Sequence, residues 1–374
     1  MSTVLLAVIA VILCVLFRIL NVNSQPHKPV IYGRDKNFIE NILFIAPFLN
    51  EPYIPTRLWG FSGHVQTILH SLIGRVRCPW PIGGRISLIL PDKSTLTYDL
   101  YEPLGAEHEG HTDDFNYMIE NLLERYPNTK LILVGFSLGG NLITKYLGEE
   151  RKRPKNIIGG ISICQGYNAI DTMVYLLQWQ NFRRFYLYIM TDNYRNIITR
   201  HKRMLLSPEM KSRYSLDETT IVSAGTLPDL DEAYSRKVHG FNSVTELYKW
   251  SSSAFYLQNI KTPMIFINAR DDPIVPEPLL PHIREFVSSH DKVMYLELSH
   301  GGHLGFYEGG LVYANPVTWL DRALAALVGG LLMAHHKCEP RDAPCEPSPR
   351  DEPDLIKSAT IIYRDPLDKP ALDA

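Results

Sequence analysis

The sequence predicts an α/β fold, in which a mostly parallel sheet carries helices on both faces. One observation is the run Leu131–Val134, which reads as a short buried strand and is followed by Gly135–Gly139 in the pattern G-x-S-x-G and by a helix-like stretch at 141–147. The other is a pair of later apolar runs, 263–268 and 293–298, each followed by a polar segment. Short apolar strands that end in polar residues are typical of parallel sheets with a site at one edge.

The motif at 135–139 predicts a nucleophile elbow, the strand–turn–helix of the α/β-hydrolase fold. A turn this tight leaves no room for side chains on either side, so glycine is expected to be needed at both Gly135 and Gly139. The turn pushes the hydroxyl of Ser137 out at the top of the sheet, and the backbone N–H of Leu138 is one expected oxyanion donor. A bare G-x-S-x-G is common by chance, but one between a predicted strand and a predicted helix is much rarer.

A nucleophilic serine needs a base, and the base needs a group that orients it. In this fold the acid and the histidine follow the serine in that order, at the ends of later strands. Asp272 stands immediately before Pro273 and is preferred to Asp271 as the acid. His303 follows two glycines, so its ring can reach Ser137, whereas His300 is nearer the strand end and is expected to be a supporting residue.

Five segments give the chain a family resemblance, namely Tyr53–Thr67, Gly135–Asn141, Cys164–Tyr167, Asn268–Pro273 and His300–Phe306. On these segments the chain resembles the α/β-hydrolase domain-containing proteins, in the branch that includes the bacterial YheT-type hydrolases. The resemblance implies a serine hydrolase for lipid esters such as acylglycerols, with a steroid as a further ligand, held in a membrane as a single-pass type II protein.

Length and composition limit the alternatives. The 374 residues suffice for one large α/β domain with an insertion. A formal net charge of -2 gives no sign of a nucleic-acid partner. The five cysteines are scattered without metal-ligand spacing, and no metal or cofactor is expected.

Residues 1–22 are predicted to form a transmembrane anchor. Val4–Phe17 is apolar but short for a span, which needs about 17–25 residues, and the flanking Arg18 is expected to snorkel. Positive residues follow the span, which by the positive-inside rule places the rest of the chain in the cytoplasm. The resemblance implies the opposite orientation, and both orientations remain open. Residues 23–80 are predicted to be an N-terminal arm, in which His64 is expected to pack the arm onto the domain, the alternative being that it faces the mouth of the active site.

Residues 81–335 are predicted to form the hydrolase domain. A hairpin is expected from strands 85–90 and 95–101, and a helical lid from the aromatic-rich insertion at about 165–261. Residues 336–374 are rich in proline and charge and are predicted to be mostly disordered.

A segment is missing near 104–114. An α/β-hydrolase places a strand, the second oxyanion loop and a further strand between the hairpin and the helix 115–126, yet a parallel crossover alone needs a dozen or more residues. The chain therefore reads as a shortened form of the family. Without those strands, 131–134 must pair with the hairpin or remain an apolar edge.

The sequence therefore favours a membrane-anchored serine hydrolase acting on lipid esters through Ser137, His303 and Asp272. The missing segment motivates an alternative, a catalytically impaired chain that binds a lipid, a steroid or a protein partner.

Overall fold

The computed structural model describes the chain except for residues 1–2, 22, 75–83, 90–94, 101–111 and 339–374. It forms two compact units, which are described separately. The larger consists of Met1–Gly74 with Lys130–His335, and the smaller of Arg75–Thr129 with His336–Ala374.

The larger unit is built on a five-stranded sheet in the order β1-β7-β6-β5-β4. Only β1 runs antiparallel, against β7, and the other neighbours are parallel. Every residue of β5, β6 and β7 is buried, as expected for strands covered on both faces. The bounds are β1 Val30–Tyr32, β4 Leu131–Phe136, β5 Ile157–Ile163, β6 Met264–Ala269 and β7 Val293–Leu298.

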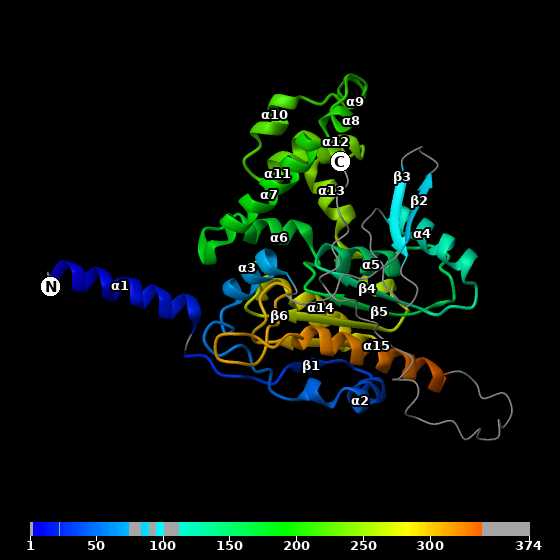
Figure 1. Ribbon diagram of the computed structural model, residues 1–374. Coiled ribbons are helices and arrows are strands. Elements are labelled where there is room, and N and C mark those ends of the chain that lie inside the picture. Colours follow the sequence, from blue (N-terminus) through cyan, green and yellow to red (C-terminus); the bar gives the residue numbers. More distant parts are fainter. Residues whose placement is uncertain (1–2, 22, 75–83, 90–94, 101–111, 339–374) are drawn as a thin grey trace, which may run out of the picture. The chain divides into compact units, whose positions relative to one another are not determined.

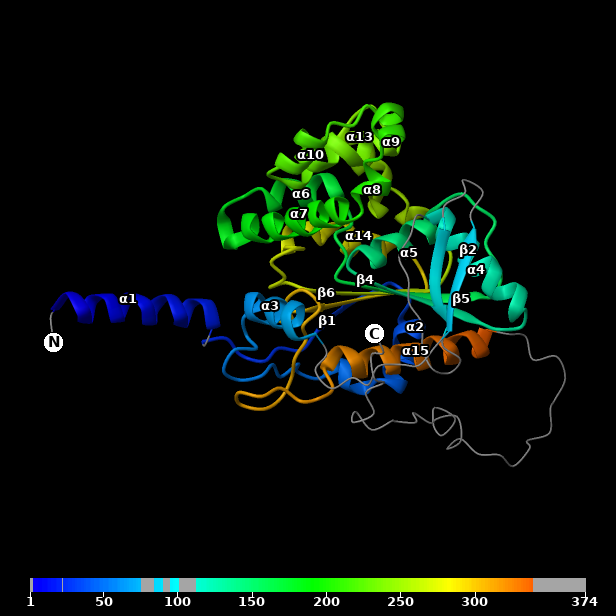
Figure 2. The same cartoon turned by 45° about the horizontal axis from the view of Figure 1, so that its top comes forward.

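Helices cover both faces of this sheet (Figure 2). Lys36–Ile45 (α2) and Trp319–Cys338 (α15) lie on one face, while Leu138–Gly148 (α5) and Pro281–Ser289 (α14) lie on the other. The α2–α15 layer packs so closely that a Cβ on Gly330 would lie 2.8 Å from Ile42 Cδ1. The predicted α/β fold with a mostly parallel sheet is confirmed.

Among the strands that the structure describes, β4 is an edge strand of this sheet. It pairs with β5 alone, and Val134 is 38% exposed. Within the described strands of the larger unit, 131–134 therefore lies at an apolar edge, which was one of the two expected outcomes.

The predicted insertion at 165–261 is helical and forms a layer on the α5 side of the sheet (Figure 1). Its own apolar core includes Ile198, Ile221 and Leu230. Its helices are α6 Ala169–Leu176, α7 Arg183–Arg200, α8 Lys202–Leu205, α9 Pro208–Tyr214, α10 Glu218–Ser223, α11 Leu227–Leu230, α12 Arg236–Val238 and α13 Val244–Ser251, with a π-helical turn at Asp231–Ser235. Short 3₁₀ turns occupy Pro47–Asn50, Gln180–Phe182, Ser253–Phe255, Leu257–Asn259 and Glu277–Leu279.

The predicted anchor forms the helix Thr3–Leu20 (α1), and the N-terminal arm contributes α2 and the helix Gly63–Ile73 (α3). The apolar side chains of α1 between Val4 and Phe17 are exposed. Within the described ranges, no helix combines the length and the apolar character needed to cross a membrane, so the predicted anchor at 1–22 is not shown here.

The smaller unit contains the predicted hairpin, with strands Gly84–Ile89 (β2) and Thr95–Leu100 (β3), and the helix Thr112–Arg125 (α4). The hydroxyl of Tyr98 donates to Asn121 Oδ1 at 2.7 Å and ties the hairpin to α4. Most of the segment 104–114 and of the predicted disordered tail lies outside the described residues. The tail was placed slightly too early, because α15 continues to Cys338.

Candidate active site

Ser137 stands in a strained turn between β4 and α5. Its φ of 50° and ψ of -116° are unusual for a residue with a side chain, and such strain is characteristic of functional turns. A Cβ on Gly135 would lie 2.3 Å from the carbonyl oxygen of Gly139, so glycine is required there. A Cβ on Gly139 would meet nothing within 4 Å. We expected that a side chain would not fit at either glycine, and this is wrong for Gly139. Only Gly135, on the strand side of the turn, lies too close to other atoms to carry a Cβ.

The structure brings Ser137, His303 and Asp272 together in one hydrogen-bonded row. His303 lies between the other two, with Nδ1 2.8 Å from Asp272 Oδ2 and Nε2 2.8 Å from Ser137 Oγ. A carboxylate only accepts hydrogen bonds, so Nδ1 carries the ring proton. In the neutral ring Nε2 then accepts from the serine hydroxyl, which is the arrangement a general base needs.

The Asp272 carboxylate is held from a second direction. Its Oδ1 accepts the backbone N–H groups of Ile274 and Val275, at 2.8 and 2.9 Å, in the turn that follows β6. The residue is 2% exposed. A buried carboxylate with its lone pairs satisfied in this way keeps one orientation toward His303.

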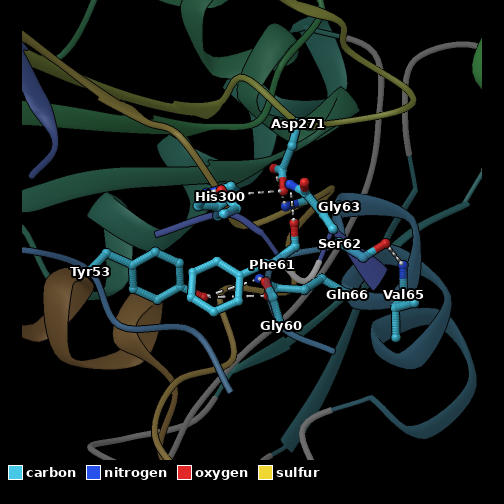
Figure 3. Close-up of polar contacts among 12 residues, drawn as sticks. Tyr53, Gly60, Phe61, Ser62, Gly63, Val65, Gln66, Asp271 and His300 are labelled. Carbon is cyan, nitrogen blue, oxygen red and sulfur yellow. Dashed lines mark hydrogen bonds and ion pairs between the residues drawn. The ribbon is translucent and has the colours of Figure 1, made fainter. Parts of the chain in front are cut away.

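Asp271 and His300 are the alternatives to Asp272 as the acid and to His303 as the base. They form a separate pair (Figure 3). Asp271 Oδ2 lies 3.4 Å from His300 Nδ1, and Asp271 Oδ1 accepts the N–H of Gly302 at 2.9 Å. Burial raises the pKa of the Asp271 carboxyl, while the contacts with His300 and Gly302 oppose that rise. The placement of His300 agrees with its expected supporting position.

Helix α3 holds the loop that carries His303. The N–H of His303 donates to Thr67 Oγ1 at 2.8 Å, and the N–H of Tyr307 donates to Gln66 Oε1 at 2.8 Å. Sequence reasoning did not assign these two residues a part in the site. The signal was present, because Gln66 and Thr67 both lie in the segment Tyr53–Thr67 that carries the family resemblance.

His64 contacts the helical insertion. Its Nδ1 lies 2.9 Å from the hydroxyl of Tyr186 on α7, and the two rings stack. Burial and the nearby Arg183 lower the pKa of His64, while burial and the charge of Asp272 raise the pKa of Tyr186 to about 12. A polar cavity of about 230 Å³ lies beside this contact, lined by His64, Asn181, Arg183, Arg270, Asp271, Asp272, Pro273, Pro276, Glu277 and Pro278.

Cys164 lies next to the acid and the base. Its sulfur, a carboxylate oxygen of Asp272 and a ring nitrogen of His303 lie within 4.8 Å of one another, close enough to hold a metal ion. Burial raises the pKa of the Cys164 thiol well above its usual range, which favours the protonated form. A metal ion bound here would use a His303 nitrogen that otherwise hydrogen-bonds to Asp272 or Ser137. Metal binding and the hydrogen-bonded row Ser137–His303–Asp272 therefore exclude each other.

Leu138 begins α5, so its N–H belongs to the first turn, whose N–H groups have no acceptor within the helix. This is the expected position for one oxyanion donor. The segment in which a second donor would be sought, 101–111, lies outside the described residues.

Comparison with known proteins places this geometry in a family. Residues 92–310 match the alpha/beta hydrolase fold family. The chain is 52% identical to Abhydrolase domain-containing protein 2 of Drosophila melanogaster, over 90% of this chain and 98% of that protein. The chain belongs to the α/β-hydrolase family. Another relative, Monoacylglycerol lipase ABHD2 of Homo sapiens, is 34% identical over 85% of this chain and 89% of its own length.

Among solved structures, an esterase of Pyrococcus furiosus, Pf2001, is 13% identical to this chain. It covers 68% of this chain and 91% of its own, with a TM-score of 0.40. The alignment with the Drosophila relative is 391 residues long, although the chain has 374 and only 90% of it is aligned. That relative therefore carries residues that have no counterpart in this chain.

Proposed function

We propose that this chain is a serine hydrolase that cleaves the ester bond of acylglycerols. The row Ser137–His303–Asp272, joined by two hydrogen bonds of 2.8 Å, is the observation that carries the proposal. Ser137 Oγ attacks the ester carbonyl while His303 Nε2 takes its proton. The protonated ring then gives that proton to the departing glycerol oxygen, and Asp272 stabilises the charged ring at Nδ1.

Water completes the cycle by attacking the acyl-enzyme ester, with His303 again as the base. The N–H of Leu138 donates to the oxyanion in both halves of the reaction. With one such donor the reaction is slower than with two, because each oxyanion-hole donor contributes about 10²–10³ in kcat.

Two observations support a lipid as the substrate. The helical insertion exposes large apolar side chains at the turn between α6 and α7, among them Trp179 and Phe182, and lipid ester sites need an apolar wall. Relatives at 34% identity carry the name monoacylglycerol lipase. In this proposal the insertion acts as a lid over the acyl chain.

Membrane attachment through α1 is part of the same proposal. The exposed apolar residues between Val4 and Phe17 support it, and Arg18 in the last turn suits a helix end at a lipid headgroup layer. Deletion of residues 1–20 should move the chain from the carbonate-resistant fraction to the soluble one. Equal recovery of both forms in the soluble fraction would reject the attachment.

Turnover of a 1-monoacylglycerol tests the proposed reaction. The purified chain should release fatty acid, and Ser137→Ala, which removes only the attacking oxygen, should lower the rate about 10⁶-fold, as loss of a serine nucleophile does elsewhere. Equal release by the wild-type chain and the variant would contradict the assignment.

The second candidate function is binding without turnover. It is favoured by the edge position of β4 and by the residues that the Drosophila relative has and this chain lacks. A folded chain that binds a monoacylglycerol or a steroid, such as progesterone used as the probe, yet releases no fatty acid would support it.

A further inference from the structure

Two acid–histidine pairs lie side by side at the end of β6 and β7. Neighbouring residues, Asp271 and Asp272, supply the acids, and His300 and His303 supply the rings from a single loop. Only Asp272 and His303 connect to Ser137. In the other pair His300 is buried, at 6% exposed, and the Asp271 side chain is mostly covered, at 19% exposed. A largely buried carboxylate and imidazole are costly to keep without a role.

The Asp271 carboxylate holds the backbone directly in front of His303. Its Oδ1 accepts the N–H of Gly302 at 2.9 Å. Gly302 has a φ of +56°, and a Cβ there would lie 2.4 Å from the carbonyl oxygen of Gly63. The backbone at Gly302, beside His303, therefore has a left-handed conformation and packs closely against α3. Asp271 accepts the hydrogen bond that fixes this conformation.

His300 connects Asp271 to the segment that follows α1. Its Nδ1 lies 3.4 Å from Asp271 Oδ2, and its Nε2 lies 2.9 Å from Ser24 Oγ. The ring also packs edge-on against Phe61, at a centroid distance of 5.3 Å. His300 thus faces the Asp271 carboxylate on one side at ion-pair distance, without a hydrogen bond between the two atoms, and contacts Ser24 of the N-terminal arm on the other.

We propose that Asp271 and His300 are positioning residues that set the position of His303 between Ser137 and Asp272. Asp271 acts through the Gly302 N–H, and His300 keeps the Asp271 carboxylate in place. The expected effect of these residues on the reaction rate rests on the proposed hydrolase function. Their effect on the position of His303 does not depend on that function.

Matched variants of the full chain separate positioning from general stability. Asp271→Asn keeps an oxygen that accepts the Gly302 N–H, whereas Asp271→Ala removes it. His300→Asn keeps a donor near the place of Nδ1, facing Asp271, whereas His300→Gln places its amide near Nε2 and loses that donor. In Asp271→Asn, His300 must change tautomer, and the Ser24 hydroxyl accommodates this because it both donates and accepts.

The first readout is the split between kcat and KM for monoacylglycerol hydrolysis. Asp271→Ala should lower kcat on the order of 10²-fold with KM unchanged, since a small misplacement of a catalytic group costs about that much. His300→Gln should lower kcat about tenfold, and both Asn variants should stay within about threefold of wild type. Losses that are equal within each matched pair, or that fall on KM, would overturn the proposal.

The second readout does not require turnover. The proton on His303 Nδ1, hydrogen-bonded to Asp272, gives a far-downfield proton resonance that is identified by its loss in His303→Ala. It should be kept in both Asn variants and lost or broadened in Asp271→Ala and His300→Gln. An unchanged resonance in Asp271→Ala would overturn the positioning role, even if the wild-type chain proved inactive. If the resonance changes as predicted but the wild-type chain shows no turnover, only the hydrolase function is rejected.

Discussion

At the scale of single residues, two neighbouring aspartates have separate tasks. The Asp272 carboxylate binds His303 Nδ1 and two backbone N–H groups, while Asp271 binds Gly302 and faces His300. Asp272 therefore orients the His303 ring, whereas Asp271, one residue earlier, holds the loop that carries His303.

Asp272→Asn should lower kcat by about 10⁴-fold, because an amide favours the wrong tautomer of the histidine. Asp271→Asn is the matched control, with the same chemical change one residue earlier and little expected effect. Steady-state hydrolysis of a monoacylglycerol by the two purified variants measures the difference. Comparable losses would mean that the acid has been assigned to the wrong residue.

The two glycines of the elbow should respond differently to alanine. Gly135→Ala places a Cβ 2.3 Å from a backbone oxygen and should destabilise the fold by about 1–3 kcal/mol or more. Gly139→Ala meets open space in the first turn of α5 and should be neutral or stabilising, by up to about 1 kcal/mol. Urea unfolding measures both, and a larger loss for Gly139→Ala would contradict the described turn.

The arrangement of Ser137, Asp272 and His303 was predictable from the sequence, because order along the chain and position at strand ends are visible there. The contacts of Thr67 and Ser24 were not. They join positions 236 and 276 residues apart, and no local pattern encodes such a distance.

At the scale of elements, α3 serves as a brace for the histidine loop. Thr67 Oγ1 accepts the N–H of His303 and donates to the carbonyl oxygen of Gly63, so the start of α3 and the loop are joined at one atom. The close approach of Gly63 to Asp271, where a Cβ would lie 1.9 Å from a carbonyl oxygen, joins the acid loop to the same helix.

Thr67→Val keeps the shape of the side chain but removes the acceptor, and it should lower kcat about tenfold, the equivalent of one hydrogen bond. Thr67→Ser keeps the hydroxyl and should stay near wild type. The ratio of the two kcat values is the measurement, and a ratio near one would show that α3 does not brace the loop through this atom.

Elements with strong patterns were predictable. The apolar runs that became β5, β6 and β7 are buried throughout, so their hydrophobicity alone indicates strands. β1 was missed because it has only three residues and is defined by its pairing with β7. The helices of the arm were missed because the apolar residues of 38–77 are mixed with polar ones.

At the scale of the whole molecule, β4, the strand that leads into the nucleophile elbow, lies at the edge of the described sheet. In the described part of the chain β4 has a partner on one side only, and Val134 is 38% exposed. The sequence predicted this edge from the short spacing between the hairpin and α4, because a parallel crossover does not fit there. Pairing of β4 with the hairpin was the other expected outcome, and spacing alone did not decide between them.

The segment predicted to be missing near 104–114 leads to a prediction about activity. Insertion there of the residues that the Drosophila relative has and this chain lacks should raise kcat by at least about 10²-fold, because the predicted segment would carry the second oxyanion donor. The unmodified 374-residue chain is the reference. Equal rates for the two forms would show that this chain already has two donors.

Activation of Ser137 as a nucleophile by His303 can be tested directly. The measurement is peptide mapping by mass spectrometry after treatment of the purified full chain with a fluorophosphonate, which reacts with activated serines and leaves other hydroxyls unmodified. We expect a phosphonyl adduct on Ser137 in the wild-type chain and none at that position in His303→Ala. A folded wild-type chain without the adduct, or equal labelling of Ser137 in His303→Ala, would contradict the proposed role of Ser137 and His303.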